Sequence, residues 1–233
     1  MRSIKRFFRF ILILIVIAIT VFVAVGHKKY ETAKEVLALD EAVRNIKSID
    51  NYTTIGELPD IYINAVVATE DRRFKYHNGI DLMGTVRAII VDITQKELNE
   101  GGSTITQQLA KNIYFLQDNS PVRKMAEIFM ALEIEKEYSK EEILELYFNV
   151  IYYGSGYYNI YDASVGYFGK APIDMTDYEA TLLAGVPNAP SLYSPKVNPD
   201  LAKKRQEKVI DCLLDEQYIT KDEAAQILLK MRK

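Results

Sequence analysis

Residues 59–79 read PDIYINAVVATEDRRFKYHNG, and this stretch determines which core the chain can build. Pro59 can open a helix, because a proline in the first helical turn loses no intrahelical hydrogen bond. The residues that follow it up to position 68 are apolar almost all round the helix, which indicates deep burial. This predicted core helix runs directly into Glu70 and Asp71. Two carboxylates therefore lie where the core meets the surface.

Glu70 has two interpretations. Apolar packing and a nearby helix C-terminus both disfavour a carboxylate anion. A carboxylate that readily accepts a proton is what a general base needs. Alternatively, Glu70 and Asp71 only mark the solvated edge of a buried helix, as most acidic residues do. The local sequence leaves both interpretations open.

A second candidate carboxylate, Glu127, lies in a helix predicted from Pro121 to about Tyr138. One predominantly apolar stripe of this helix comprises Val122, Met125, Ala126, Phe129, Leu132 and Lys136, and it leaves Glu127 on another face. At helical spacing from Glu127 the sequence has Arg123 among otherwise apolar residues, so a carboxylate and a guanidinium share one patch. The structural alternative is an ordinary ion pair between residues four apart, worth only about 0.2–0.5 kcal/mol.

Between these two carboxylates, residues 101–112 read GGSTITQQLAKN. The glycines permit close backbone approach, Ser103 or Thr104 can cap the following helix, and free N–H groups at its start attract phosphate oxygens. Lys111 and the basic residues before Glu127 can supply positive charge. No Gly-Lys-Ser/Thr closes the segment, so it does not predict a nucleoside triphosphate loop. A well-capped helix with a polar face is the alternative interpretation.

The rest of the chain predicts helices. Capping boxes, in which Ser or Thr precedes Glu by three residues, stand at 139–142, 176–179 and 220–223, ahead of apolar periodic runs. Ser120 before Pro121 marks a further helix start. Alternating strand patterns and hairpin dipeptides are scarce, and the glycines gather in loops. We therefore expect a mainly α-helical fold.

The N-terminus predicts a membrane anchor. Basic residues at positions 2, 5, 6 and 9 precede residues 10–25, which are apolar except for Thr20. A helix of about sixteen to nineteen such residues just spans a hydrocarbon core of about 30 Å. The preceding basic residues favour an N-terminus inside the cytoplasm, although basic residues also follow the run. A cleaved signal peptide is the alternative, but the apolar run exceeds a usual signal sequence.

The sequence divides into three parts: residues 1–26 as cytoplasmic tip and transmembrane anchor, 27–51 as a helical stalk, and 52–233 as one globular domain. The composition, 48% hydrophobic and 26% charged over 233 residues, is that of a globular protein. A formal net charge of −3 gives no basic field for a nucleic-acid partner. One cysteine, Cys212, and two histidines predict neither an intramolecular disulfide nor a Cys/His zinc cluster.

Five motifs follow one another between about residues 61 and 195. The first, E-D-x-x-F-x-x-H-x-G, consists of Glu70, Asp71, Phe74, His77 and Gly79, and the second, G-x-S-T-x-x-Q-Q, ends at Gln108 after Gly101 or Gly102. The third is R-K-x-x-E at 123–127, followed by Y-S-K and I-L-E-x-Y segments at 138–147, and the last two occupy 153–170 and 182–195. Together they resemble the motifs of the family-51 glycosyltransferases, the peptidoglycan polymerases.

The chain departs from the family pattern in two places. Asn159-Ile160 and Ala163-Ser164 stand where the family usually has Gly-Ile and Ala-Ala. The segment before Arg123 lacks a basic residue that many members carry. These departures concern substrate affinity more than catalysis.

The resemblance implies a lysozyme-like fold with a large lobe and a smaller, membrane-facing lobe. Only about forty residues follow Pro195, so the chain resembles the monofunctional members that carry no transpeptidase domain. The implied activity is polymerisation of lipid II into β-1,4 glycan strands, with inversion at the donor anomeric carbon and release of undecaprenyl pyrophosphate. The implied location is the cytoplasmic membrane, crossed once, with the catalytic domain outside.

The resemblance also assigns roles. It implies that Glu70 is the catalytic base that deprotonates the acceptor 4-hydroxyl, and that Glu127 acts on the donor side. It assigns substrate binding to Asp71, Phe74, His77, Gly79, Ser103, Thr104, Gln107, Gln108, Lys111, Arg123 and Lys124. It allows a divalent cation, Mg or Mn, at the donor pyrophosphate and no organic cofactor. The expected partners are lipid II, the growing lipid-linked strand, the membrane and other cell-wall synthesis proteins.

Two other functions remain open at this stage. A lytic transglycosylase or lysozyme shares a similar fold and cleaves the same bond with a glutamate as acid. Against it stand the Q-Q and R-K-x-x-E motifs, which suit a pyrophosphate. A catalytically silent membrane scaffold of the cell-wall machinery is the second alternative, and the retention of both glutamates argues against it.

Overall fold

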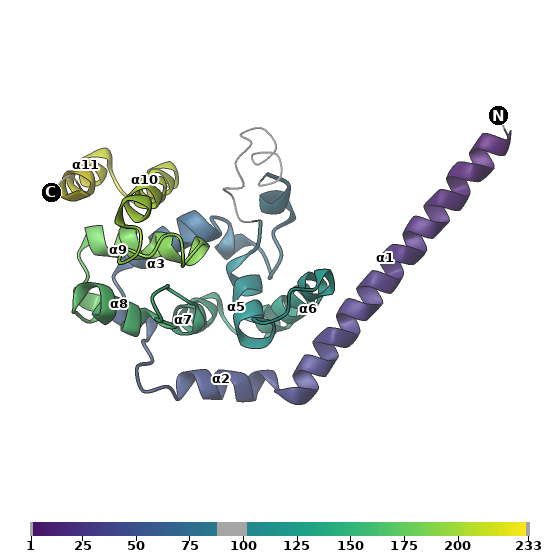
Figure 1. The fold of residues 1–233 in the computed structure, drawn as a ribbon, viewed down its shortest axis with the longest axis horizontal. Helices are drawn as coiled ribbons and strands as arrows, with labels where there is room; N and C mark the ends of the chain where they lie inside the picture. The colour runs from purple at the N-terminus through teal and green to yellow at the C-terminus, as the bar shows by residue number, and fades with distance from the viewer. Residues whose placement is uncertain (1, 88–101, 232–233) are drawn as a thin grey trace.

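The computed structural model describes residues 2–87 and 102–231 of the chain. Its helices are α1 (Arg2–Val36), α2 (Leu39–Lys47), α3 (Asp60–Glu70), α5 (Ile105–Tyr114), α6 (Pro121–Glu137), α7 (Lys140–Val150), α8 (Ile160–Phe168), α9 (Asp177–Gly185), α10 (Pro199–Asp215) and α11 (Lys221–Met231). Short 3-10 helices occupy Ile55–Glu57, Phe74–Tyr76, Pro172–Asp174 and Val186–Asn188. No strand occurs in the described ranges, so the prediction of a mainly α-helical fold is confirmed (Figure 1).

Helix α3 belongs to the centre of the core, as its apolar sequence predicts. Tyr62, Ala65 and Val66 have no exposed surface, and α9 and α10 pack against the helix (Figure 1). On another side the Tyr62 ring lies 5.1 Å from the ring of Phe148 on α7. Each large apolar side chain buried in this way contributes about 1.5–3 kcal/mol to stability. This packing fixes α3, and with it the position of the residue at its end, Glu70.

The predicted helix starts agree with the structure. Ser139 and Thr176 each form a capping box with the glutamate three residues later. Thr220 exchanges the same hydrogen bonds with Glu223. Ser120 stands directly before α6, with a proline in the first turn, but its side chain makes no capping hydrogen bond. Local sequence therefore determined where these helices begin.

Helix α6 is covered on two faces, of which the apolar stripe is one. The buried residues are Ala126, Glu127, Met130, Ala131 and Ile134. Leu132, a member of the stripe, is 42% exposed, and Lys136 is exposed as well. The stripe instead meets α1 through Met125 and Phe129. The periodicity did not distinguish the two faces, because α6 is covered on both sides and its inner face carries a carboxylate.

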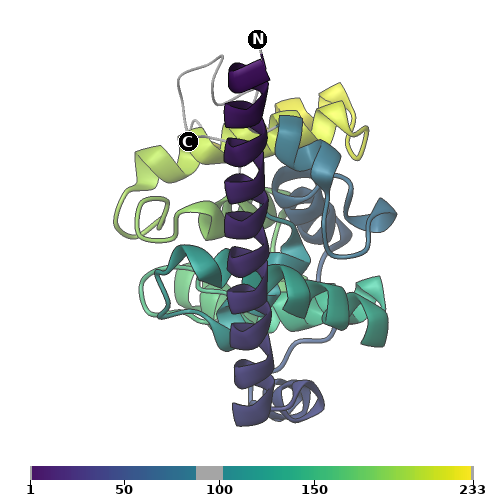
Figure 2. The ribbon, with the colours of Figure 1, turned by 90° about the vertical axis from the view of Figure 1, so that its right-hand side faces the viewer.

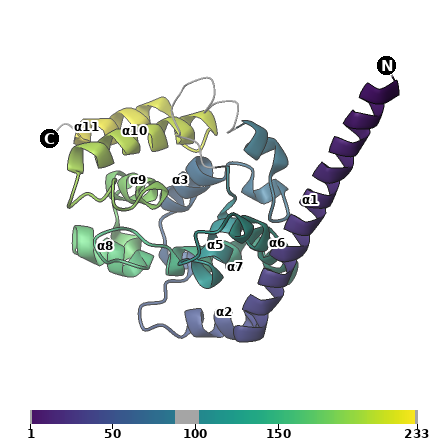
Figure 3. The same ribbon diagram turned by 45° about the vertical axis from the view of Figure 1, so that its right-hand side comes forward.

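Helix α1 joins the apolar segment and the start of the predicted stalk in one continuous helix. Up to Val25 its apolar side chains are mostly exposed, and the helix is long and apolar enough to cross a membrane. From Gly26 onward it packs along α6, and Tyr30 belongs to the hydrophobic core. Figure 2 shows α1 crossing in front of the domain, and Figures 1 and 3 show it extending away from the domain toward the N-terminus.

The second half of the predicted stalk also contacts the domain. After a short break at residues 37–38 the chain enters α2, which packs against α7. Leu39 and Val43 of α2 are buried in the core cluster. The expected boundary at residue 52 stays a prediction, and residues 27–51 pack against the domain and contribute buried side chains to its core.

Candidate active site

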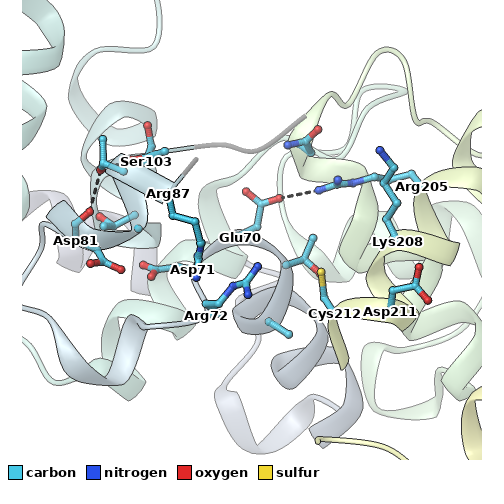
Figure 4. Close-up of a pocket in the computed structure, with 17 residues that line it drawn as sticks. Glu70, Asp71, Arg72, Asp81, Arg87, Ser103, Arg205, Lys208, Asp211 and Cys212 are labelled. Atoms are coloured by element: carbon cyan, nitrogen blue, oxygen red, sulfur yellow. Dashed lines mark hydrogen bonds and ion pairs between the residues drawn. The ribbon is translucent and has the colours of Figure 1, made fainter. Parts of the chain in front are cut away.

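Glu70 is the last residue of α3, and its side chain is only 5% exposed. Gln108 on α5 donates a hydrogen bond from Nε2 to Glu70 Oε2 at 2.8 Å. The guanidinium of Arg205 on α10 lies 3.5 Å from Oε1, and Figure 4 shows the two side chains directed toward each other. Oε1 has no hydrogen-bond partner in the described residues. The hydrogen bond from Gln108 thus orients the carboxylate through Oε2, and Oε1 can accept a hydrogen bond from a bound hydroxyl group.

Asp71, the next residue, holds the motif together. Its Oδ2 lies 2.9 Å from His77 Nε2 and accepts a hydrogen bond from the backbone N–H of Ile105 at 3.0 Å. Thr104 donates from Oγ1 to the carbonyl of Gly79 at 2.8 Å and caps α5. The first two motifs are therefore joined directly to each other. We infer that the hydrogen bonds of Asp71 and Thr104 hold the start of α5 against the end of α3.

Two further residues of the first motif lie in packed positions. Phe74 has no exposed surface, and its ring centroid lies 4.3 Å from the ammonium of Lys140. This burial argues for a packing role in place of the predicted substrate contact. Gly79 has a φ of 88°, and a Cβ there would lie 2.9 Å from the carbonyl oxygen of Ala131. A side chain at this position would separate the first motif from α6.

Glu127 lies at the centre of a cationic cluster. Arg123 Nε is 2.8 Å from Glu127 Oε1 and Lys124 Nζ is 3.2 Å from Oε2. Lys124 also donates hydrogen bonds to Ser103 Oγ at 2.7 Å and to Gln107 Oε1 at 2.9 Å. The ion pair with Arg123 that the sequence suggested is present, but Glu127 is 2% exposed and binds a second cation as well. Partial burial lowers the pKa of the Lys124 ammonium, while Glu127 opposes that effect.

Two clefts meet at Glu70. The α10 cleft, of about 260 Å³, is lined by residues that include Asp71, Arg72, Arg87, Arg205 and Lys208 (Figure 4). The α6 cleft, of about 250 Å³, is lined by Gln107, Gln108, Lys111, Arg123, Lys124 and Glu127 together with residues common to both. Glu70, Ser103 and Asn188 line both clefts. A carboxylate at the junction of two polar clefts can act on a group held in one and a group held in the other.

The structure brings most of the predicted site residues together. Glu70, Ser103, Gln107, Gln108, Lys111, Arg123, Lys124 and Glu127 line one cleft. Asp71 and Thr104 line the α10 cleft and also join the two motifs, whereas Phe74, His77 and Gly79 line neither cleft. Gly101, one of two glycines that can open the second motif, lies outside the described residues.

Arg205 is a site residue that the sequence motifs did not reveal. It is 8% exposed and lies on the buried face of α10 with Ala202, Gln206 and Val209. In the sequence, Arg205 falls on the apolar face of an amphipathic helix. This position could have marked it as a site residue, because a charged residue is rarely buried unless it is paired. Its partner, Glu70, belongs to a distant part of the sequence.

The described residues offer little for a protein-bound metal ion. In residues 2–87 and 102–231 no group of three or more His, Cys, Asp and Glu side chains is placed to hold one. In the α6 cleft, Glu127 is already paired with two cations. These side chains do not fit a metal held by the protein alone. The divalent cation stays a prediction, and the reaction proposed below does not require it.

Comparison with known proteins identifies the family. The family model described as Transglycosylase matches residues 40–213. The chain belongs to the transglycosylase family. The predicted membership of the family-51 glycosyltransferases is thereby confirmed, and the matched range includes both clefts.

Several penicillin-binding proteins are similar to this transglycosylase chain. Penicillin-binding protein 1A of Neisseria lactamica is 45% identical over 177 residues, which are 76% of this chain and 22% of that protein. Penicillin-binding protein 1F of Bacillus subtilis (strain 168) is 44% identical over 171 residues, which are 73% of this chain and 24% of that protein. The chain thus spans less than a quarter of the length of these relatives.

A solved structure is also similar. The 2.6 Å crystal structure of penicillin-binding protein 1A from Haemophilus influenzae matches with a TM-score of 0.46 and 24% identity. The match covers 76% of this chain and 17% of that chain. The family assignment depends on the sequence model and not on this likeness. The apolar helix α1 and these relatives together fit a single-pass protein of the cytoplasmic membrane.

Proposed function

We propose that the chain is a peptidoglycan glycosyltransferase that polymerises lipid II into β-1,4-linked glycan strands and releases undecaprenyl pyrophosphate. The observation that carries this proposal is the position of Glu70, at the junction of the α10 cleft and the cationic α6 cleft. Membership of the transglycosylase family supports it independently.

Glu70 acts as the general base in this reaction. The acceptor binds in the α10 cleft with its N-acetylglucosamine 4-hydroxyl at the carboxylate, and the hydroxyl proton passes to Glu70. The acceptor oxygen then forms a bond to the anomeric carbon of the donor N-acetylmuramic acid. Gln108 and Arg205 orient the carboxylate for this step. A positioned base of this kind contributes about 100- to 10,000-fold to the rate.

The α6 cleft holds the leaving group. As the bond from the anomeric carbon to the pyrophosphate oxygen breaks, negative charge develops on that oxygen. Lys111, Arg123 and Lys124 line this cleft and can stabilise that charge. Glu127 keeps Arg123 and Lys124 in fixed positions through its two ion pairs. Because attack and departure occur on opposite sides of the anomeric carbon, its configuration inverts.

The membrane helix suits a lipid-linked substrate. An anchored enzyme and an anchored substrate share one surface, which raises their effective concentration. We propose that the N-terminus lies in the cytoplasm and the domain outside, since basic residues precede the apolar run. Other cell-wall synthesis proteins are the expected protein partners.

The test is polymerisation of labelled lipid II by the purified protein in detergent, with products separated on a gel. We expect the wild type to form polymer and Glu70→Gln to form none. Asp60→Asn, at the exposed start of the same helix, is the matched control and should polymerise normally. Cleavage of preformed glycan without polymer formation would replace the proposal with a lytic activity. The absence of both reactions would favour the scaffold.

A further inference from the structure

Helices α1 and α6 lie against each other in a defined register. A Cβ at Gly26 would overlap the side chain of Met125, so the lack of a side chain at Gly26 lets the two helices approach closely. One turn further along both helices, the Tyr30 ring centroid lies 5.9 Å from that of Phe129. In this region α1 and α6 therefore run in the same direction, and the start of α6 lies toward the membrane end of α1.

Polar contacts fix this register at its far end. Tyr30 donates a hydrogen bond to Glu133 Oε2 at 2.5 Å. Lys34 Nζ lies 2.8 Å from Glu133 Oε1 and donates to the Tyr30 hydroxyl at 3.0 Å. Because these three groups are partly buried and paired with one another, a slip of one turn along the helix would separate them. The register is thus a specific one.

One residue before Tyr30, Lys29 connects α1 to the active site. Lys29 Nζ lies 2.5 Å from Asp118 Oδ2, and the other carboxylate oxygen accepts the backbone N–H of Ser120 at 2.8 Å. The backbone carbonyl of Asp118 accepts a hydrogen bond from Arg123 Nη1 at 2.7 Å. Arg123 in turn forms the ion pair with Glu127. One residue, Asp118, thus contacts the membrane helix, the start of α6 and a cation of the α6 cleft.

The register also sets the position of Arg123 along the axis of α1. Met125 lies opposite Gly26, directly after the apolar run that ends at Val25. Arg123 precedes Met125 by two residues, which is about 3 Å along a helix. Its backbone is therefore level with the end of the apolar run. In a membrane crossed by α1, the end of the apolar run would mark the edge of the hydrocarbon core, next to the headgroup region where the pyrophosphate of a lipid-linked sugar belongs.

We infer that Lys29 and Asp118 are positioning residues, which hold Arg123 at the membrane surface where the donor pyrophosphate arrives. Neither residue touches the substrate in this arrangement; both act through Arg123. The inference rests on the proposed function and extends it, because the membrane helix then contributes to the geometry of the α6 cleft as well as to anchoring. The contact between α1 and the segment around the start of α6 then contributes to substrate binding.

The kinetic test uses the full chain in vesicles that contain lipid II. Lys29→Met should raise KM about tenfold and leave kcat within about twofold, because a loosely held Arg123 weakens binding of the pyrophosphate. Lys28→Met is the matched control: Lys28 is the exposed neighbouring residue and has no ion pair among the described residues. Lys29→Arg should retain the wild-type KM, since it keeps the charge that faces Asp118.

A double variant tests whether the two residues act together. Asp118→Asn should raise KM to a similar extent, and Lys29→Met combined with Asp118→Asn should do no more than either alone. Additive effects, or equal effects of Lys29→Met and Lys28→Met, would overturn the inference. A fall in kcat with unchanged KM would do the same.

Hydrogen exchange separates this inference from the proposed function. In detergent, Lys29→Met should speed amide exchange in peptides that cover residues 118–124, whereas Lys28→Met should not. Unchanged exchange in Lys29→Met would contradict the positioning role whatever the activity. If the wild type forms no polymer, the proposed function fails, and the exchange experiment still decides whether Lys29 holds this segment.

Discussion

The α10 cleft and the α6 cleft each contain a buried glutamate, and the two glutamates are held in opposite ways. Glu70 receives one hydrogen bond from an amide and faces a guanidinium at 3.5 Å. Glu127 is paired with Arg123 at 2.8 Å and Lys124 at 3.2 Å. Similar burial therefore goes with different surroundings: Glu70 faces one amide and one more distant cation, whereas Glu127 holds two cations at shorter distances.

The largest expected effect is that of replacing Glu70. Glu70→Gln should reduce the rate of lipid II polymerisation by about 100- to 10,000-fold, because the amide cannot accept the hydroxyl proton. Its free energy of unfolding should fall as well, because the buried guanidinium of Arg205 loses its anion. Polymerisation assays and urea unfolding of the same preparation would measure both. A folded Glu70→Gln protein that still forms polymer would contradict the role of Glu70 as base.

Glu127→Gln should lower stability because it leaves two cations, Arg123 and Lys124, without their shared anion. We expect the free energy of unfolding to fall by about 1–2 kcal/mol. The expected loss is small because the two cations are 25% and 42% exposed. Urea unfolding measures it, with Glu137→Gln at the exposed end of α6 as control. A Glu127→Gln protein as stable as the control would contradict the role of Glu127 in holding the two cations.

Arg205→Met should lower kcat about tenfold, which corresponds to about 1.4 kcal/mol of transition-state stabilisation. Without the guanidinium, Gln108 alone orients the carboxylate of Glu70. Arg205→Lys should recover part of the rate, and Lys204→Met, an exposed neighbour, should not differ from wild type in assays of lipid II polymerisation. A wild-type kcat in Arg205→Met would mean that Arg205 only packs against the helix core.

The smallest effect concerns Lys124. Partial burial lowers the pKa of this ammonium, so it loses its proton at a lower pH than an ordinary lysine does. As pH rises through this lowered pKa, the α6 cleft loses a cation and the rate should fall. Lys124→Arg keeps its charge and should extend activity to higher pH, even if its rate near neutrality is reduced. A pH–rate profile with Lys136→Arg as control measures this, and coincident alkaline limbs would contradict it.

The sequence predicted the helices because their signals are local. Capping boxes at Ser139 and Thr176 act within one turn of helix, and the apolar run before Glu70 could only be stable inside a core. For the apolar stripe of α6, periodicity indicated a covered face but could not say which element covers it. There the partner was α1, which the sequence assigned to a membrane anchor and stalk.

The sequence by itself determined the family, the mainly helical fold, the apolar N-terminal helix and the glutamates at the centre of the site, because motifs and periodicity are properties of short segments. Only the tertiary structure decided which distant side chains meet. Arg205 faces Glu70 because α10 packs on α3, and Lys29 reaches Asp118 because α1 packs on α6. Such pairs depend on the packing of whole helices, and no local pattern in the chain specifies them.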